Sequence, residues 1–362
     1  MSQVYINSFG LVSSLGANLD EAIQQLQTPP VPDVRVLQGL DHSIPFYKIQ
    51  STSTSTSAPE ASNWYLRCKN LVQQVAAEAG VERRSGGLFL ASSSVNVGAM
   101  ERSECKAGSL PDFLTELGEM LAWEGPVFWI NTACTSSLNA LLAAQDAITC
   151  GLIKDALIIG LELENQLTLA GFAGMQLLSP DSAKPFAKQR NGLVLGEAVA
   201  ALYLSTQPAR WRLAGGAQVI DSGQASGASL DAYKSMLDKT LKQAQMVATH
   251  IDLVKVQAAG SQANDAVEAH ALADFFGVTP PLITLKTLIG HTLGASGAAE
   301  IALLLTLIEQ RQWPPLTRAE DIDPALPINF PSEMPAQIRQ ILVCNLGFGG
   351  SHSCIALEDM TT

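Results

Sequence analysis

A cysteine flanked by small residues, Cys134, lies between two segments with different patterns. Residues 125–130 form a short apolar run typical of a buried strand, and apolar side chains recur at helical spacing from Leu138 to Ile148. A thiol at a strand-to-helix turn can act as a nucleophile, because the turn lifts it out of the sheet and the helix N-terminus favours the thiolate. Free cysteines are more often simply buried in a core. Other residues therefore decide whether Cys134 is a core thiol or a nucleophile.

A histidine in the second half of the chain, His291, has a similar setting. It follows an apolar run at 282–285 and precedes a second helix rich in alanine and leucine, and nearby glycines let other backbone or a ligand approach closely. A lone histidine near a helix start is more often structural than catalytic. A neutral imidazole that faces Cys134 would, however, be able to donate a hydrogen bond to a thioester or enolate oxygen, or to tune the thiol.

Two further features accompany these turns. Lys286 stands among apolar residues, and Glu300 follows it at helical distance, which favours a buried ion pair that holds the turn of His291 over a surface ammonium. Residues 347–351 read Gly-Phe-Gly-Gly-Ser, a turn flexible enough to bring an N–H group to an oxyanion. Together with the N–H group of Cys134 it would make a hole with two donors. Taken alone, this glycine-rich pattern is more often just a turn.

The elements that would position these residues follow one plan twice. Residues 126–148 and 282–308 each read as a strand, a turn of small residues with one reactive side chain, and an Ala/Leu helix. We therefore predict a duplicated α/β fold with βαβαβ halves at residues 1–205 and 206–362, the first carrying the cysteine turn and the second the histidine and Gly-Phe-Gly-Gly turns. Two such halves packed face to face would give a layered α/β/α/β/α architecture.

Composition excludes several classes of function. The chain has 362 residues with a net charge of −12 and no basic run, which argues against nucleic acid as a partner. No stretch of 18 apolar residues and no signal-like N-terminus is present, and the six cysteines and five histidines lack metal-ligand spacing. We expect a cytoplasmic protein without metal or membrane contact. Residues 28–60, rich in Pro, Ser and Thr, are predicted to form a long surface excursion; the pattern leaves open whether residues 40–60 are ordered.

Five ordered motifs resemble one family, the β-ketoacyl-acyl-carrier-protein synthases (ketosynthases) of the thiolase fold. Each motif is weak alone, but together and in this order they are very specific, and the match runs along nearly the whole chain. They are Gly10-Leu-Val-Ser-Ser-Leu-Gly16, Thr132-Ala-Cys-Thr-Ser-Ser137, Lys184-Pro-Phe with Arg190-Asn-Gly-Leu-Val-Leu-Gly-Glu197, Lys286 with Gly290-His-Thr-Leu-Gly-Ala-Ser-Gly297, and Asn345-Leu-Gly-Phe-Gly-Gly350.

The resemblance implies roles for the residues already singled out. It implies an acyl chain carried on Cys134, an oxyanion hole from the backbone of Cys134 and Phe348, and a Phe348 ring that gates an acyl tunnel. His291 would be one of two histidines that assist malonyl decarboxylation and condensation, supported by Lys286 and Glu300. The resemblance also implies a dimer that closes the tunnel. It further implies acyl groups delivered on the phosphopantetheine of an acyl carrier protein, with no other cofactor.

One position departs from the family pattern. Where the resemblance calls for the first catalytic histidine, the chain has Ala259, and the loop from there to Asp265 is shorter than usual. A methyl group cannot donate a hydrogen bond to a developing enolate, and such donors are worth about 10²–10⁴ in rate. Standard decarboxylative condensation should therefore be slow, unless Gln257, Ser261 or Gln262 reaches into the site.

Three hypotheses follow. The first is the chain-length-factor-like subunit of a ketosynthase heterodimer in fatty-acid, polyketide or aryl-polyene biosynthesis, with a complete ketosynthase as its partner. This fits the lost histidine, although chain length factors typically lack the cysteine. A second reading is an active β-ketoacyl synthase or acyltransferase, as a homodimer, that uses Cys134 with one histidine replaced. A third is a hydrolase or thiolase-like protein, which the His291 and Gly-Phe-Gly-Gly turns disfavour.

Overall fold

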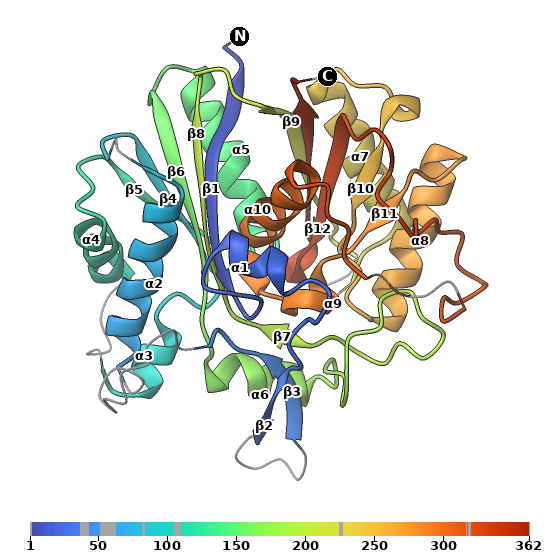
Figure 1. The fold of residues 1–362 in the computed structure, drawn as a ribbon, viewed down its shortest axis with the longest axis horizontal. Coiled ribbons are helices and arrows are strands. Elements are labelled where there is room, and N and C mark those ends of the chain that lie inside the picture. The colour runs from blue at the N-terminus through green and yellow to red at the C-terminus, as the bar shows by residue number, and fades with distance from the viewer. Residues whose placement is uncertain are drawn as a thin grey trace.

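The computed structural model describes residues 2–36, 43–50, 63–81, 84–104, 110–223, 227–315, 317 and 320–361. Strands and helices are interspersed along the chain (Figure 1). Up to residue 205 they are β1 (Val4–Ser13), α1 (Leu19–Gln24), β2 (Asp33–Val36), β3 (Ser43–Tyr47), α2 (Trp64–Glu78), β4 (Gly87–Ala91), α3 (Val97–Glu101), α4 (Leu110–Met120), β5 (Val127–Ile130), α5 (Ser136–Thr149), β6 (Asp155–Glu162), α6 (Gln166–Gly174), β7 (Leu195–Gly196) and β8 (Ala198–Ser205). After it they are β9 (Trp211–Ile220), α7 (Leu230–Ala244), β10 (Leu253–Lys255), α8 (Gln262–Phe276), β11 (Leu282–Ile283), α9 (Lys286–Ile289), α10 (Ser296–Glu309), β12 (Gln340–Leu346) and β13 (Ser351–Asp359).

The strand pairing is the same in the two halves. In the first, β8 pairs antiparallel with β1 and β6, and β4 pairs parallel with β6 and β5. In the second, β13 pairs antiparallel with β9 and β12, and β10 pairs parallel with β12 and β11. A short antiparallel contact between β1 and β9 joins the two sets into one ten-stranded sheet. This repeated pairing is what an internal duplication produces; the division into domains at residues 205 and 206 stays a prediction.

The helices form three layers around the strands. In Figure 1, α5 and α10 lie in the middle, α2 and α4 cover the first half's strands, and α7 and α8 cover the second half's. Both central helices contact strands of both halves. The layered α/β/α/β/α architecture predicted from the sequence is therefore confirmed.

The central helix α10 is buried on every side because strands and helices surround it. All its residues from Ser296 to Ile308 are buried. Small residues allow the close contacts: a Cβ atom at Gly160 of β6 would lie 3.0 Å from the Cβ of Ala298, and one at Gly297 would meet Leu138 of α5 at 2.9 Å. No helix in the part of the chain that the structure describes is long and apolar enough to cross a membrane.

The segment at residues 28–60 differs from the expected surface excursion. Within it, β2 and β3 form an antiparallel pair, and β3 continues in parallel pairing with β7, next to the histidine turn. Ile44 and Phe46 of β3 are 2% and 3% exposed, so this strand belongs to the core. The prediction was wrong for β3 because the apolar run Ile44–Tyr47 is short and one of its two partner strands, β7, is distant in sequence. Residues 37–42 and 51–62 lie outside the described residues.

Candidate functional site

The cysteine turn between β5 and α5 is held by its own small polar side chains. Ala133 adopts a left-handed backbone conformation with φ of +53°, which turns the chain sharply just before the thiol. The Ser136 hydroxyl donates to the carbonyl of Ala133 at 2.6 Å and accepts from the N–H of Thr132 at 3.0 Å. The Asn139 amide donates to the Thr132 hydroxyl at 2.7 Å, which ties the turn to α5. These bonds explain why small hydroxyl-bearing residues surround Cys134.

The structure brings Cys134 and His291 together from the two halves. The His291 Nε2 atom lies 3.1 Å from the Cys134 Sγ atom, and the Nδ1 atom lies 3.0 Å from the Ser296 hydroxyl. Two backbone hydrogen bonds hold His291 against β7 and the residue that precedes β7. The His291 N–H donates to the Val194 carbonyl at 2.7 Å, and the His291 carbonyl accepts from the Gly196 N–H at 3.1 Å. Cys134 is 4% exposed and His291 2%, so the pair is shielded from solvent.

Burial sets the resting protonation of this pair. It raises the pKa of Cys134 to about 12, which outweighs the lowering effects of Lys286 and of the N–H groups of Phe348 and Cys134. It lowers the pKa of His291 to about 3, helped by the positive charge of Lys286. The N–H groups at the turn act in the expected direction, toward the thiolate, but burial outweighs them in the resting pocket. The resting pair is a thiol and a neutral imidazole, and the imidazole is placed to take the thiol proton during attack.

A buried charge cluster lies behind His291. Lys286 and Lys255 both form ion pairs with Glu300, and all three side chains are at most 1% exposed. Lys255 also donates to the Asn345 amide oxygen at 2.5 Å, and the Asn345 amide donates to the Cys134 carbonyl at 3.0 Å. The cluster thus connects both reactive turns.

The pKa shifts in this cluster follow from burial and the two lysines. Burial lowers the pKa of Lys286 to about 8, and Glu300 partly offsets this. Burial acts to raise the pKa of Glu300, but Lys255 and Lys286 outweigh it and hold that pKa below its usual value. Sequence reasoning found the Lys286–Glu300 pair and missed Lys255 and Asn345. A lysine inside the apolar run Leu253–Val256 was the available signal, since buried lysines are almost always paired.

Phe348 stands at the opening of the pocket. Its backbone N–H and that of Cys134 both point to the Cys134 sulfur as donors, the arrangement expected for an oxyanion hole. Its ring stacks on Phe172 with centroids 5.4 Å apart and planes at 12°. Both rings line a small cavity of about 40 Å³ together with Cys134 and His291. The cavity is too small for a long acyl chain as it stands.

The opposite wall of the cavity is the segment after β10. Ala259 lines it, as do Gln257, Ser261 and Asp265. Of the three residues considered as substitutes for the missing histidine, Gln262 is turned away, because its amide donates to the Arg190 carbonyl at 3.2 Å and it does not line the cavity. Ser261 lines the cavity but caps α8 by accepting from the Asn264 N–H at 3.3 Å. Gln257 lines the cavity, and its amide oxygen makes no hydrogen bond to the described residues.

The backbone of this wall is clamped by two buried carboxyl groups. Asp265 accepts from the N–H groups of Phe186 at 3.0 Å, Gly260 at 3.1 Å and Ala259 at 3.3 Å. Burial nevertheless raises the pKa of Asp265 to about 7. Glu268 accepts two more N–H groups, and burial raises its pKa as well. The wall is rigid even though it lacks the expected imidazole.

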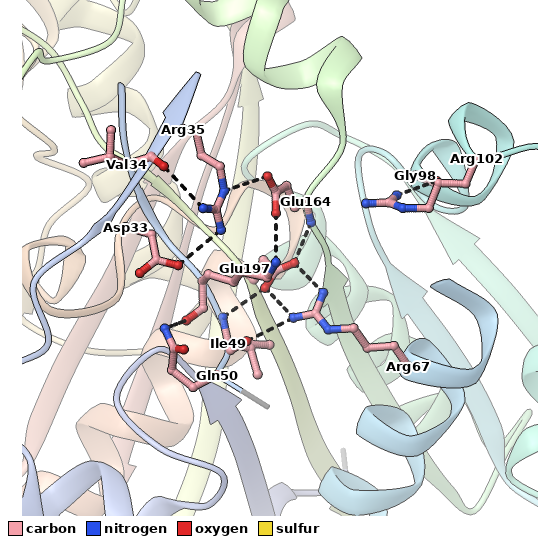
Figure 2. A network of polar contacts seen from close by, with 11 residues as sticks. Asp33, Val34, Arg35, Ile49, Gln50, Arg67, Gly98, Arg102, Glu164 and Glu197 are labelled. Carbon is pink, nitrogen blue, oxygen red and sulfur yellow. Dashed lines mark hydrogen bonds and ion pairs between the residues drawn. The ribbon is translucent and has the colours of Figure 1, made fainter. Parts of the chain in front are cut away.

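A second polar network supports the strand pair that holds His291 (Figure 2). Glu197, which is fully buried, accepts from Arg67 at 2.6 and 2.7 Å, from the Ile49 N–H at 2.9 Å and from the Glu164 N–H at 2.8 Å. Arg35 of β2 binds Glu164 at 2.8 Å. Since the carbonyl of Tyr47 also accepts from the Glu197 N–H at 2.8 Å, the network fixes β3 against β7. Sequence analysis missed it, because its members come from four separate segments.

Comparison with known proteins agrees with this geometry. Residues 115–209 match the profile "Beta-ketoacyl synthase, N-terminal domain", and residues 216–320 match "Beta-ketoacyl synthase, C-terminal domain". A putative polyketide beta-ketoacyl synthase 1 from Streptomyces halstedii is 30% identical over 264 residues, which are 67% of this chain and 62% of that protein. The chain spans 62% to 65% of the length of the first curated relatives that it matches.

Solved structures share the fold over the whole chain. A chain in the complex of the ketosynthase ApeO with its chain length factor ApeC from Xenorhabdus doucetiae superposes with a TM-score of 0.86 and 24% identity, covering 99% of this chain and 98% of that one. A chain in the complex of a type II PKS acyl-carrier protein with its ketosynthase bound to the hexaketide (AntDE:AntF) superposes with a TM-score of 0.81 and 19% identity, covering 99% of each. At these identities the likeness establishes the fold. The ordered motifs, the two matched profiles and the duplicated sheet together show that this chain belongs to the β-ketoacyl synthase family.

Proposed function

We propose that the chain is the chain-length-factor-like subunit of a ketosynthase heterodimer, able to hold an acyl group on Cys134 but with little condensing activity of its own. The observation that carries the proposal is the contrast inside one cavity. Cys134 and His291 are 3.1 Å apart, whereas the methyl group of Ala259 lines the wall where the family resemblance calls for a second imidazole. Acyl transfer to a thiol needs the first pair only; decarboxylation of a malonyl group also needs the second donor.

The acyl-transfer step follows from the geometry. His291 takes the Cys134 proton at Nε2 while the sulfur attacks the thioester carbonyl of an acyl group on a carrier phosphopantetheine. The N–H groups of Cys134 and Phe348 donate hydrogen bonds to the oxyanion. Collapse of the tetrahedral intermediate breaks the carbon–sulfur bond to the carrier, and the His291 proton passes to the leaving thiolate. The pKa of His291 near 3 leaves its ring neutral, and the contact of Nε2 with the Cys134 sulfur at 3.1 Å places it to take the proton.

An edge of the sheet is the proposed partner surface. β5 pairs only with β4 among the described strands, so its other edge is free. Phe128 of β5 is 42% exposed, and Leu167 and Met175, beside or within α6, are 68% and 50% exposed. A free strand edge with apolar neighbours is a template for pairing with another chain. We propose that a complete ketosynthase docks here.

The five described cysteines are free, which supports a reducing, cytoplasmic setting.

Co-purification from the native operon, with stoichiometry by native mass spectrometry, tests the partner assignment. We expect a complex of one copy of this chain with one complete ketosynthase. Isolation of an active homodimer that condenses malonyl-carrier protein would overturn it. That outcome would favour the second candidate, an active synthase or acyltransferase, which the intact Cys134–His291 contact supports.

A further inference from the structure

Gln257 is a buried side chain on the cavity wall whose amide oxygen has no partner. It is 8% exposed and lines the cavity with Cys134, Ala259 and His291. Within the described part of the chain, its Oε1 atom makes no hydrogen bond. A buried amide oxygen without a donor costs free energy, so such groups are rare unless something binds them. This makes Gln257 a candidate contact for whatever enters the cavity.

The backbone around Gln257 cannot shift to relieve that cost. Its own N–H and the N–H of Ala258 each donate to Glu268 at 2.8 Å. The Tyr233 hydroxyl donates to the same carboxyl group at 2.7 Å. Because Glu268 fixes the main chain, the carboxamide of Gln257 can rotate but has to stay at the cavity.

Two features limit what can occupy the cavity: its size, and the N–H groups of Cys134 and Phe348 that would bind the thioester carbonyl. About 40 Å³ holds the first few atoms of an acyl group attached to Cys134. The thioester carbonyl at that position would be bound by the N–H groups of Cys134 and Phe348. Gln257 would therefore contact a second oxygen atom of the acyl group, farther along the chain than the thioester carbonyl. The atom without a partner is the amide oxygen, which can only accept, so it suits a hydroxyl group, which can donate to it.

We propose that the Gln257 amide oxygen accepts a hydrogen bond from a hydroxyl group close to the thioester of the acyl group on Cys134, and that the site thereby selects 3-hydroxyacyl groups over saturated ones. The inference rests on the proposed acceptance of acyl groups by Cys134. A saturated chain would leave the buried carboxamide unpaired, and sites of this kind discriminate strongly against analogues that lack the bonding group. Gln257 is then a specificity-determining residue.

The test compares two four-carbon thioesters of N-acetylcysteamine, 3-hydroxybutyryl and butyryl, on the full-length chain. Acylation rates of Cys134 are followed by intact mass. The ratio of the two rates is compared between the natural chain and Gln257→Met, which keeps the side chain's length without its polar atoms. We expect the ratio to fall about tenfold, the effect of one buried hydrogen bond. Comparing ratios cancels the different intrinsic reactivities of the thioesters.

Gln262→Met is the matched control, since it makes the same chemical change five residues away and outside the cavity; it should leave the ratio unchanged. Gln257→Leu serves the same comparison if the methionine variant melts much earlier. If both thioesters acylate Cys134 and the ratio does not change in the Gln257 variants, the selectivity proposal is wrong while acyl acceptance stands. If neither thioester acylates the natural chain, acyl acceptance is wrong and the selectivity proposal falls with it.

Discussion

The two walls of the cavity differ in chemistry but not in how firmly they are built. On one wall, Cys134 and His291 are 3.1 Å apart and are backed by the Lys255–Lys286–Glu300 cluster. On the other, Ala259 offers only a methyl group, yet Asp265 and Glu268 bind four N–H groups of residues 257–260. The altered wall therefore keeps a scaffold that would hold a catalytic side chain in place. Under the proposed function, the pocket accepts an acyl group but lacks the donor that decarboxylation needs.

Removing the nucleophile should have the largest effect. Cys134→Ala is expected to abolish acylation by acyl-carrier protein, since Cys134 is the lining residue that carries a thiol and lies 3.1 Å from His291. Intact mass after incubation measures it. Cys150→Ala, at an exposed cysteine, is the control and should acylate normally. An adduct that persists in Cys134→Ala would mean that the intact wall is not the acyl acceptor.

Breaking the charge cluster behind His291 should strongly lower the free energy of unfolding of the chain. Glu300→Gln leaves the ammonium groups of Lys255 and Lys286 buried without a counter-charge, which costs about 3–5 kcal/mol. Urea unfolding measures the change. Asp238→Asn, in the exposed pair with Lys242 at 2.6 Å, is the control and should cost about 0.5 kcal/mol or less. Equal costs for the two variants would contradict the account of the cluster.

Restoring the missing donor should sharpen the contrast between the walls. Ala259→His is expected to raise the release of carbon dioxide from malonyl-carrier protein about 10²-fold, because an imidazole can donate to the enolate. It should also destabilise the chain by about 1–3 kcal/mol, since the cavity beside Ala259 is only about 40 Å³. Ala259→Leu adds bulk without a donor and should give no gain. If neither variant raises the rate, the absent imidazole is not what limits decarboxylation.

The pH dependence of the Cys134 thiol should be the most graded effect, because it is spread over several pH units. With a pKa of about 12, Cys134 is protonated at neutral pH, and its thiolate fraction rises about tenfold per pH unit below that value. Alkylation by iodoacetamide should accelerate steadily between about pH 6 and about pH 9. With the pKa of His291 near 3, its titration adds no step in that range. Peptide mapping separates Cys134 from Cys150, and a plateau for Cys134 near neutral pH would reveal a thiolate–imidazolium pair instead.

Local pattern was enough to predict the layers and the meeting of two reactive turns. Cys134 and His291 each stand between a strand pattern and a helix pattern, and the duplication placed those turns opposite each other. The partners of these residues were harder to see, because they depend on contacts between distant segments. Asn345 touches the Cys134 carbonyl from β12, and Glu197 binds Arg67 across 130 positions.

The altered wall shows the same limit. The sequence offered Gln257, Ser261 and Gln262 as equal substitutes for the missing donor. Only the three-dimensional structure separates them, because the partner that engages Gln262 is the carbonyl of Arg190, 72 positions away. Short apolar strands were the other gap: β3 was predicted as part of a surface excursion, since its partner β7 is only two residues long.

The central claim is that this pocket accepts an acyl group but does not condense it alone. The most direct test is a time course of intact mass on the isolated chain, first with acyl-carrier protein and then with malonyl-carrier protein. The account predicts an acyl adduct on Cys134 that forms in the first stage and persists in the second. Loss of the adduct, with release of an elongated 3-oxoacyl product, would contradict it.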